Sequence, residues 1–157
     1  MEIKYVSGDI LTPDNSEKNQ GIVVCHQVNC KGVMGAGLAK QVRVKFPGVY
    51  RVYKEKCDAF GSENLGSVQF CSCLCDAGYI IANVFGQDRY GRDKQYTDYN
   101  ALRKAFRYIA QAFPNDAIRI PYLMGCGLAG GDWNIVLQII NEELVDKGCC
   151  VEIWKFN

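Results

Sequence analysis

Residues 21–42 read GIVVCHQVNCKGVMGAGLAKQV, an apolar run that passes through a glycine-rich loop into a helical pattern. The apolar run is typical of a strand buried on both faces of a sheet. Glycine has no Cβ, so backbone N–H groups in the loop can turn toward a ligand. The start of a helix adds unpaired donors and the positive end of the helix dipole. The stretch therefore predicts either a phosphate-binding loop or a tight turn between strand and helix.

A second stretch also joins a strand pattern to a helical pattern through a glycine-rich loop. Residues 125–133 read GCGLAGGDW, in which four of the nine residues are glycine, and they follow a short strand pattern. Two such loops in one small chain favour a diphosphate held between them. Neither loop contains the lysine followed by Ser or Thr that marks a P-loop, and neither has the spacing of the dinucleotide fingerprint. We therefore expect a ligand with a diphosphate that is not handled as a nucleoside triphosphate.

The rest of the chain alternates strand patterns with helical patterns. This alternation predicts a three-layer α/β/α fold with a mixed, mainly parallel central sheet of about six strands, in a single domain spanning residues 1–157. Ligands of such sheets bind beyond the carboxyl ends of the strands, where both glycine loops would lie. The strands are expected at 3–6, 21–26, 67–75, 79–85, 117–121 and 151–156, with a hairpin turn at 76–78. Two helices are expected at 35–46 and 50–57. A third is expected to begin after a cap at Thr97 or Asp98, and a fourth to run from a cap at Asp132 to a stop at Gly148.

Composition narrows the class of protein. The length of 157 residues suits one domain, and 18 basic against 17 acidic residues give no case for a large nucleic-acid surface. The first ten residues carry charges and have no long apolar core, so we expect no signal peptide. No apolar run approaches the roughly 20 residues that a membrane span needs. We expect a cytoplasmic monomer with no membrane partner.

The nine cysteines are an odd number and show no secreted framework, so we expect reduced thiols. Cys71, Cys73 and Cys75 would share one face of a strand, which suits either metal ligation or packing as small apolar side chains. There is no C-x-x-C pair, and the single histidine, His26, is far away in the sequence. We therefore expect no metal site and no cofactor.

Three motifs together resemble the macrodomain family over nearly the whole chain. Gly8-Asp9-Ile10 is similar to the family's adenine loop. Gly35-Ala36-Gly37 and Gly125-Cys126-Gly127-Leu128, with Ala129 after it, are similar to its two phosphate loops. The resemblance implies that the ligand is ADP-ribose or an ADP-ribose derivative. A carboxylate at Asp9 could accept a hydrogen bond from the adenine amine, although capping a turn is the alternative.

Two branches of the family are most similar. His26 to Gly32, followed by Gly35-Ala36-Gly37 and Lys45-Phe46-Pro47, looks like the yeast-type ADP-ribose 1″-phosphate phosphatases. Met34 to Gly37 and Gly125 to Leu128 also look like the terminal ADP-ribose glycohydrolases, which act on ADP-ribosylated protein or nucleic acid. That branch uses a lysine near the tip of the strand at 79–85 and an aspartate directly after Gly-Cys-Gly-Leu. Here the first region reads Phe85-Gly86-Gln87 and the second position is Ala129, which argues against a Schiff-base route.

The resemblance implies a hydrolase that acts at the distal ribose; the alternative is a non-catalytic reader of ADP-ribosylated partners. His26 is the first candidate for proton acceptor because a histidine titrates near neutral pH, although a core histidine is the alternative. Asp88 lies in a polar loop that is either a lid over the ligand or an ordinary solvated loop, and Asp132 is a weaker candidate because it also suits a helix cap. Asn29 and Lys31 are candidates for binding ribose hydroxyls and a phosphate, or they form an ordinary polar loop.

Overall fold

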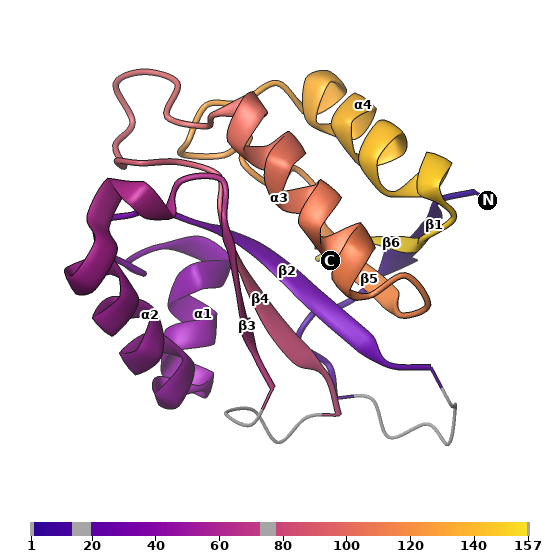
Figure 1. The fold of residues 1–157 in the computed structure, drawn as a ribbon, viewed down its shortest axis with the longest axis horizontal. Coiled ribbons are helices and arrows are strands. Elements are labelled where there is room, and N and C mark those ends of the chain that lie inside the picture. The colour runs from indigo at the N-terminus through magenta and orange to yellow at the C-terminus, as the bar shows by residue number, and fades with distance from the viewer. Residues whose placement is uncertain (1, 14–19, 73–77, 157) are drawn as a thin grey trace.

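The central sheet has six strands in the order β1-β6-β5-β2-β4-β3 (Figure 1). The computed structural model describes residues 2–13, 20–72 and 78–156. All strand pairs are parallel except β3 with β4, which confirms the predicted mixed, mainly parallel sheet. The strands are β1 (Lys4–Ser7), β2 (Ile22–Val28), β3 (Val68–Cys71), β4 (Ile80–Phe85), β5 (Ala117–Pro121) and β6 (Cys150–Lys155).

Helices cover both faces of this sheet, as the three-layer prediction requires. Figure 1 shows α1 and α2 on one face and α3 and α4 on the other. The α-helices are α1 (Gly37–Lys45), α2 (Pro47–Phe60), α3 (Tyr99–Ala112) and α4 (Trp133–Glu143), and short 3-10 turns occupy Gly61–Asn64 and Val145–Lys147. No helix in the described parts of the chain has the length and apolar character to cross a membrane.

The core explains why the run at the start of β2 is apolar without interruption. Val23 and Cys25 pack into the cluster under α3 and α4. Val24, between them, packs on the opposite face with residues of α1 and α2 such as Val42 and Val49. A strand that is buried on both faces has no solvent-facing positions, so no alternation of polar and apolar residues is expected there.

Most boundaries agree with the sequence-based expectation to within one or two residues, and three of the differences affect the interpretation. β2 continues to Val28, two residues past its predicted end, so His26 lies inside the strand rather than at its tip. Helix α2 begins at Pro47 directly after α1, because proline suits the first helical position. β3 ends at Cys71; Cys73, Cys75 and residues 76–77 of the predicted turn lie outside the described residues.

The predicted helix caps are present. Asp98 accepts a hydrogen bond from the N–H of Ala101 at the start of α3, and Asp132 accepts one from the N–H of Asn134 at the start of α4. Gly148 adopts the left-handed conformation, with φ 87°, at the end of the 3-10 turn that follows α4. Together these caps fix where the loops after β4 and β5 end and the helices begin.

Candidate functional site

A groove of three connected hollows runs along the edge where the parallel strands end. The first, the Asp9 hollow, has a volume of about 220 Å³. The second, the glycine hollow, has about 260 Å³ and shares Pro121 and Tyr122 with the first. The third, the Gln87 hollow, has about 360 Å³ and shares Ala36 and Leu128 with the second. The loops after β1, β2, β4 and β5 all contribute to this groove.

The Asp9 hollow combines a carboxylate with aromatic walls. The three residues of the Gly8-Asp9-Ile10 motif line it together with Tyr122, Trp154 and Phe156. Asp9 Oδ1 accepts a hydrogen bond from the N–H of Leu11 at 2.9 Å, so the carboxylate also caps the turn. Tyr122 is 38% exposed and Phe156 is 72% exposed, so both rings offer apolar surface against which a base can pack. Sequence reasoning named neither aromatic residue: Tyr122 directly follows the expected strand at 117–121, which is a signal, whereas Phe156 lies inside the expected strand at 151–156.

The two glycine loops face each other across the glycine hollow, but their helices differ. Helix α1 has no side-chain hydrogen bond at its N-cap, Ala36, and no acidic residue in its first turn. Helix α4 is capped by the carboxylate of Asp132. Because an anion is stabilised by unpaired N–H groups and a positive dipole end, the start of α1 suits a phosphate and the start of α4 does not.

Across the hollow, the 125–128 part of the second loop contributes Gly125, Gly127 and Leu128. Leu123, just before it, has φ 63° and is the one non-glycine residue with positive φ in the described parts of the chain. Such a conformation costs about 1 kcal/mol or more and persists where surrounding contacts impose it. The strained residue lies in the lining itself, as is common at binding sites.

The Gln87 hollow is lined mainly by apolar surface, into which a few polar side chains project, and it is not acidic. Among its described lining residues, Arg92 is the one cation and there is no Asp, Glu or His. Gln87, from the region where the resemblance places the lysine of the glycohydrolases, and Ala129, at the position of their aspartate, both line it. Tyr90 and Arg92 bring the loop after β4 into its wall, as a lid would require. Gln27 and Tyr90 were not identified from the sequence as site residues, because their position depends on how the strands align.

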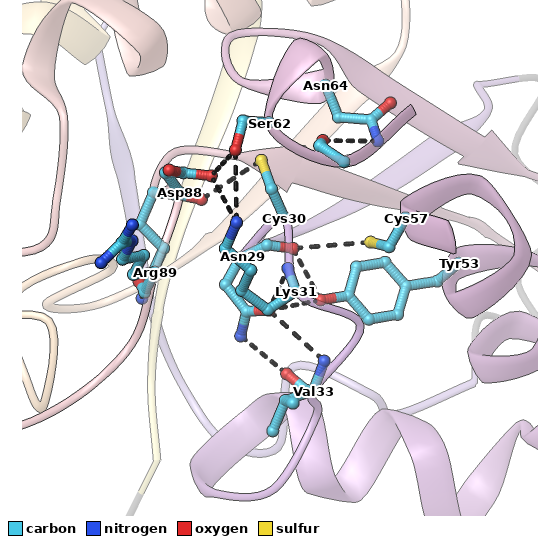
Figure 2. Close-up of polar contacts among 12 residues, drawn as sticks. Asn29, Cys30, Lys31, Val33, Tyr53, Cys57, Ser62, Asn64, Asp88 and Arg89 are labelled. Carbon is cyan, nitrogen blue, oxygen red and sulfur yellow. Dashed lines mark hydrogen bonds and ion pairs between the residues drawn. The ribbon is translucent and has the colours of Figure 1, made fainter. Parts of the chain in front are cut away.

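Asn29 lines the Gln87 hollow, but its amide is used within its own loop (Figure 2). Its Oδ1 accepts hydrogen bonds from the N–H groups of Lys31 and Val33, and its Nδ2 donates to the carbonyl of Val33 at 2.8 Å. The hydroxyl of Tyr53 lies 2.9 Å from the same Oδ1. The side chain therefore braces the loop between β2 and α1.

Lys31 and Asp88 are brought together, but away from the groove lining. Lys31 Nζ lies 3.6 Å from Asp88 Oδ1, which also accepts a hydrogen bond from the hydroxyl of Ser62 at 2.6 Å. Figure 2 shows Arg89 pointing away from this cluster. The predicted roles of Lys31 as a phosphate ligand and Asp88 as a base are not supported by this geometry, because each side chain is engaged with the other.

His26 is the one proton-acceptor candidate of the three that lines the groove, in the glycine hollow. Its ring is 2% exposed, and Nε2 lies 2.5 Å from Asn83 Oδ1 on the neighbouring strand. Burial lowers the pKa of His26 to about 4. It is therefore neutral near pH 7 and a weak base there. Asp132 is absent from the lining and serves as the α4 cap.

Comparison with known proteins places the fold. No family model matches the chain. The chain is 29% identical over 104 residues to an ADP-ribose 1″-phosphate phosphatase of Saccharomyces cerevisiae (strain YJM789), a match that covers 64% of this chain and 56% of that protein. The chain thus spans about half the length of the curated relatives that it matches.

Solved structures cover the whole fold. A protein of unknown function from Bacteroides thetaiotaomicron is 29% identical with a TM-score of 0.85, covering 99% of this chain and 98% of that one. A macrodomain protein from Streptomyces coelicolor is 26% identical with a TM-score of 0.77, covering 98% of each chain. The chain has the macrodomain fold, and the predicted resemblance to the macrodomain family is confirmed.

The buried, neutral state of His26 predicts how stability depends on pH. The folded pKa of about 4 lies below the ordinary value of 6.5, so between these values the unfolded chain binds a proton that the folded chain does not. Stability should therefore fall as pH drops from 6.5 to 4, by on the order of 3 kcal/mol from this group. Urea unfolding at several pH values should show this slope, reduced in His26→Gln. An identical pH dependence in both proteins would contradict the assignment.

Proposed function

We propose that this chain, which has the macrodomain fold, binds ADP-ribose along the groove and hydrolyses the phosphate ester of ADP-ribose 1″-phosphate. The order of the three hollows carries the proposal. A carboxylate with aromatic walls comes first, a helix start facing a glycine loop comes second, and a hollow that carries Arg92 comes third, each hollow sharing lining residues with the next. Adenosine, diphosphate and distal ribose follow one another in the same order in ADP-ribose.

Each hollow offers its part of the ligand a suitable partner. Asp9 can accept a hydrogen bond from the adenine amine while Tyr122 and Phe156 flank the base. The start of α1 and the 125–128 loop offer backbone N–H groups to the diphosphate. The distal ribose then reaches the Gln87 hollow. The name of the yeast relative, an ADP-ribose 1″-phosphate phosphatase, supports the same ligand.

The chemistry of the Gln87 hollow favours a phosphate ester over a glycosidic bond. Glycoside hydrolysis generally uses a pair of carboxylates, and the described residues lining this hollow include none. Transfer of a phosphoryl group depends mainly on positioning and on stabilising charge on the phosphoryl oxygens. Arg92 can supply that charge.

In the proposed step, water attacks the phosphorus and the bond between phosphorus and the 1″ oxygen breaks. The water loses a proton and the leaving 1″ oxygen gains one, which gives ADP-ribose and inorganic phosphate. The groove clamps the adenosine and diphosphate, so much of the barrier is removed by positioning. We propose that neutral His26 shapes the glycine hollow and does not accept the proton.

An assay of three substrates tests the reaction. Incubation with ADP-ribose 1″-phosphate, a protein ADP-ribosylated on carboxylates, and ADP-ribosylated DNA should release phosphate from the first. Hydrolysis of either of the other two alone would show that the substrate assignment is wrong. Binding of ADP-ribose with no substrate consumed would instead support a reader of ADP-ribosylated partners.

Gly127→Val should abolish ADP-ribose binding and leave the fold intact. A Cβ at Gly127 meets no atom within 4 Å, so the fold has room for a side chain, whereas the residue lines the glycine hollow and a side chain would block the approach of the diphosphate. Calorimetry with ADP-ribose, AMP and ATP measures the loss, and a thermal melt checks folding. Wild-type affinity in a folded variant, or equal affinity of the wild type for ATP, would count against the proposed site.

Arg92→Gln should lower kcat for ADP-ribose 1″-phosphate by about a hundredfold or more, the usual scale for losing one preorganised charge-stabilising group. ADP-ribose itself lacks the 1″ phosphate, so its affinity should change little. Arg89→Gln is the matched control, because Arg89 lies on the same loop but is not among the residues that line the hollow. Equal losses in both variants would show that the loop's charge, and not Arg92 in the hollow, matters.

A further inference from the structure

The side chain of Gln27, on β2, is bonded to both ends of the loop that forms one wall of the Gln87 hollow. This lid loop, residues 88–96, leaves after Gln87 and returns at Thr97, and those two residues form an isolated antiparallel bridge. Gln27 Nε2 donates to Gln87 Oε1 at 2.7 Å and to Thr97 Oγ1 at 2.9 Å. The amide of Gln27 therefore closes the base of the lid loop.

The same cluster reaches the second glycine loop, residues 125–131, called here the phosphate loop. Thr97 Oγ1 donates its proton to the carbonyl of Gly125 at 2.6 Å. The N–H of Gly131 donates to that same carbonyl at 2.8 Å and closes the loop. The backbone N–H groups of Tyr96 and Thr97 also donate to the carbonyl of Ala129, at 2.7 and 3.2 Å. The end of the lid loop is thus bonded to the phosphate loop at two carbonyls.

The position of the Gln27 side chain also explains why Gly86 and Gly125 have no side chain. A Cβ on Gly86 would lie 2.6 Å from Gln27 Oε1, and a Cβ on Gly125 would lie 2.7 Å from it. Real Cβ atoms do not approach so closely, so a side chain at either position would displace the Gln27 amide from the place where it bonds to Gln87 and Thr97. Gly125, which the sequence suggests as a ligand-binding residue, is needed for this packing.

We propose that Gln27 and Thr97 are positioning residues that make the lid loop and the phosphate loop move as one unit. Diphosphate binding to the phosphate loop then also fixes Tyr90 and Arg92 in the wall of the Gln87 hollow. The physical reason is that Thr97 is 4% exposed, and a buried polar group that loses its partner is not compensated by water. The inference rests on the proposed function only in assigning the diphosphate to residues 125–128 of the phosphate loop.

Hydrogen exchange without ligand tests the coupling directly. Thr97→Val keeps the shape of the side chain but removes the hydroxyl, so backbone amides in both 88–96 and 125–131 should exchange about tenfold faster, the scale of one lost hydrogen bond. Gln27→Met, which removes the shared donor, should give the same pattern. Ser62→Ala is the matched control: it removes the bond to Asp88 and should speed exchange in the lid loop alone. Unchanged exchange in 125–131 in both Thr97→Val and Gln27→Met would overturn the proposal.

Calorimetry then separates a positioning role from simple loss of structure. Thr97→Val should bind ADP-ribose about tenfold more weakly, whereas AMP, which has no distal ribose, should keep its affinity within about twofold. Thr97→Ser should restore ADP-ribose affinity, because it keeps the hydroxyl. Equal loss for both ligands would contradict the positioning role. If wild-type protein binds no ADP-ribose, the proposed function fails while the exchange result still decides whether the loops are coupled.

Discussion

Parallel pairing of β1, β6, β5, β2 and β4 places the carboxyl ends of five strands at one edge of the sheet. The loops after β1, β2, β4 and β5 lie in the groove for this reason, although they are far apart in the sequence. The continuous burial of Val23, Val24 and Cys25 holds β2 at the centre, with helices on both faces. The site therefore depends on the core: a shift of β2 along its neighbours would move the glycine hollow away from the loops that complete it.

Electrostatics then distinguishes two loops that look alike in sequence. Both glycine loops lead from a strand into a helix, yet Asp132 places a carboxylate at the start of α4 while the start of α1 carries none. The second loop can therefore contribute backbone groups from residues 125–128, but the favourable helix dipole comes from α1. In the same way, Arg92 gives the Gln87 hollow a positive charge that no carboxylate among its described lining residues offsets.

The glycine loops and the fold class could be predicted from the sequence because both depend on local pattern. Missing Cβ atoms, apolar runs and helix caps are each visible in a few consecutive residues. The state of His26 could not be predicted, because the polar Gln27 after it suggested that the strand ends there. In the structure β2 continues to Val28, and Asn83 of the neighbouring strand takes the imidazole as a buried partner.

The sequence also could not predict the roles of Lys31, Asp88 and Thr97, because each of these residues contacts a partner that is distant in the chain. Lys31 and Asp88 are opposite charges in two different loops, and their pairing with Ser62 appears once the loops meet. Thr97 reads from the sequence as a possible helix cap, whereas Asp98 supplies the cap and Thr97 bonds to Gly125. A local sequence pattern cannot decide between such alternative roles of a residue, because the contacts that decide them are made with residues distant in the sequence.

A crystal structure of the protein with ADP-ribose would test the central claim most directly. We predict adenine in the Asp9 hollow beside Phe156, the diphosphate between the start of α1 and residues 125–128, and the distal ribose in the Gln87 hollow near Arg92. A ligand bound outside this groove, or bound with its adenine in the Gln87 hollow, would contradict the account.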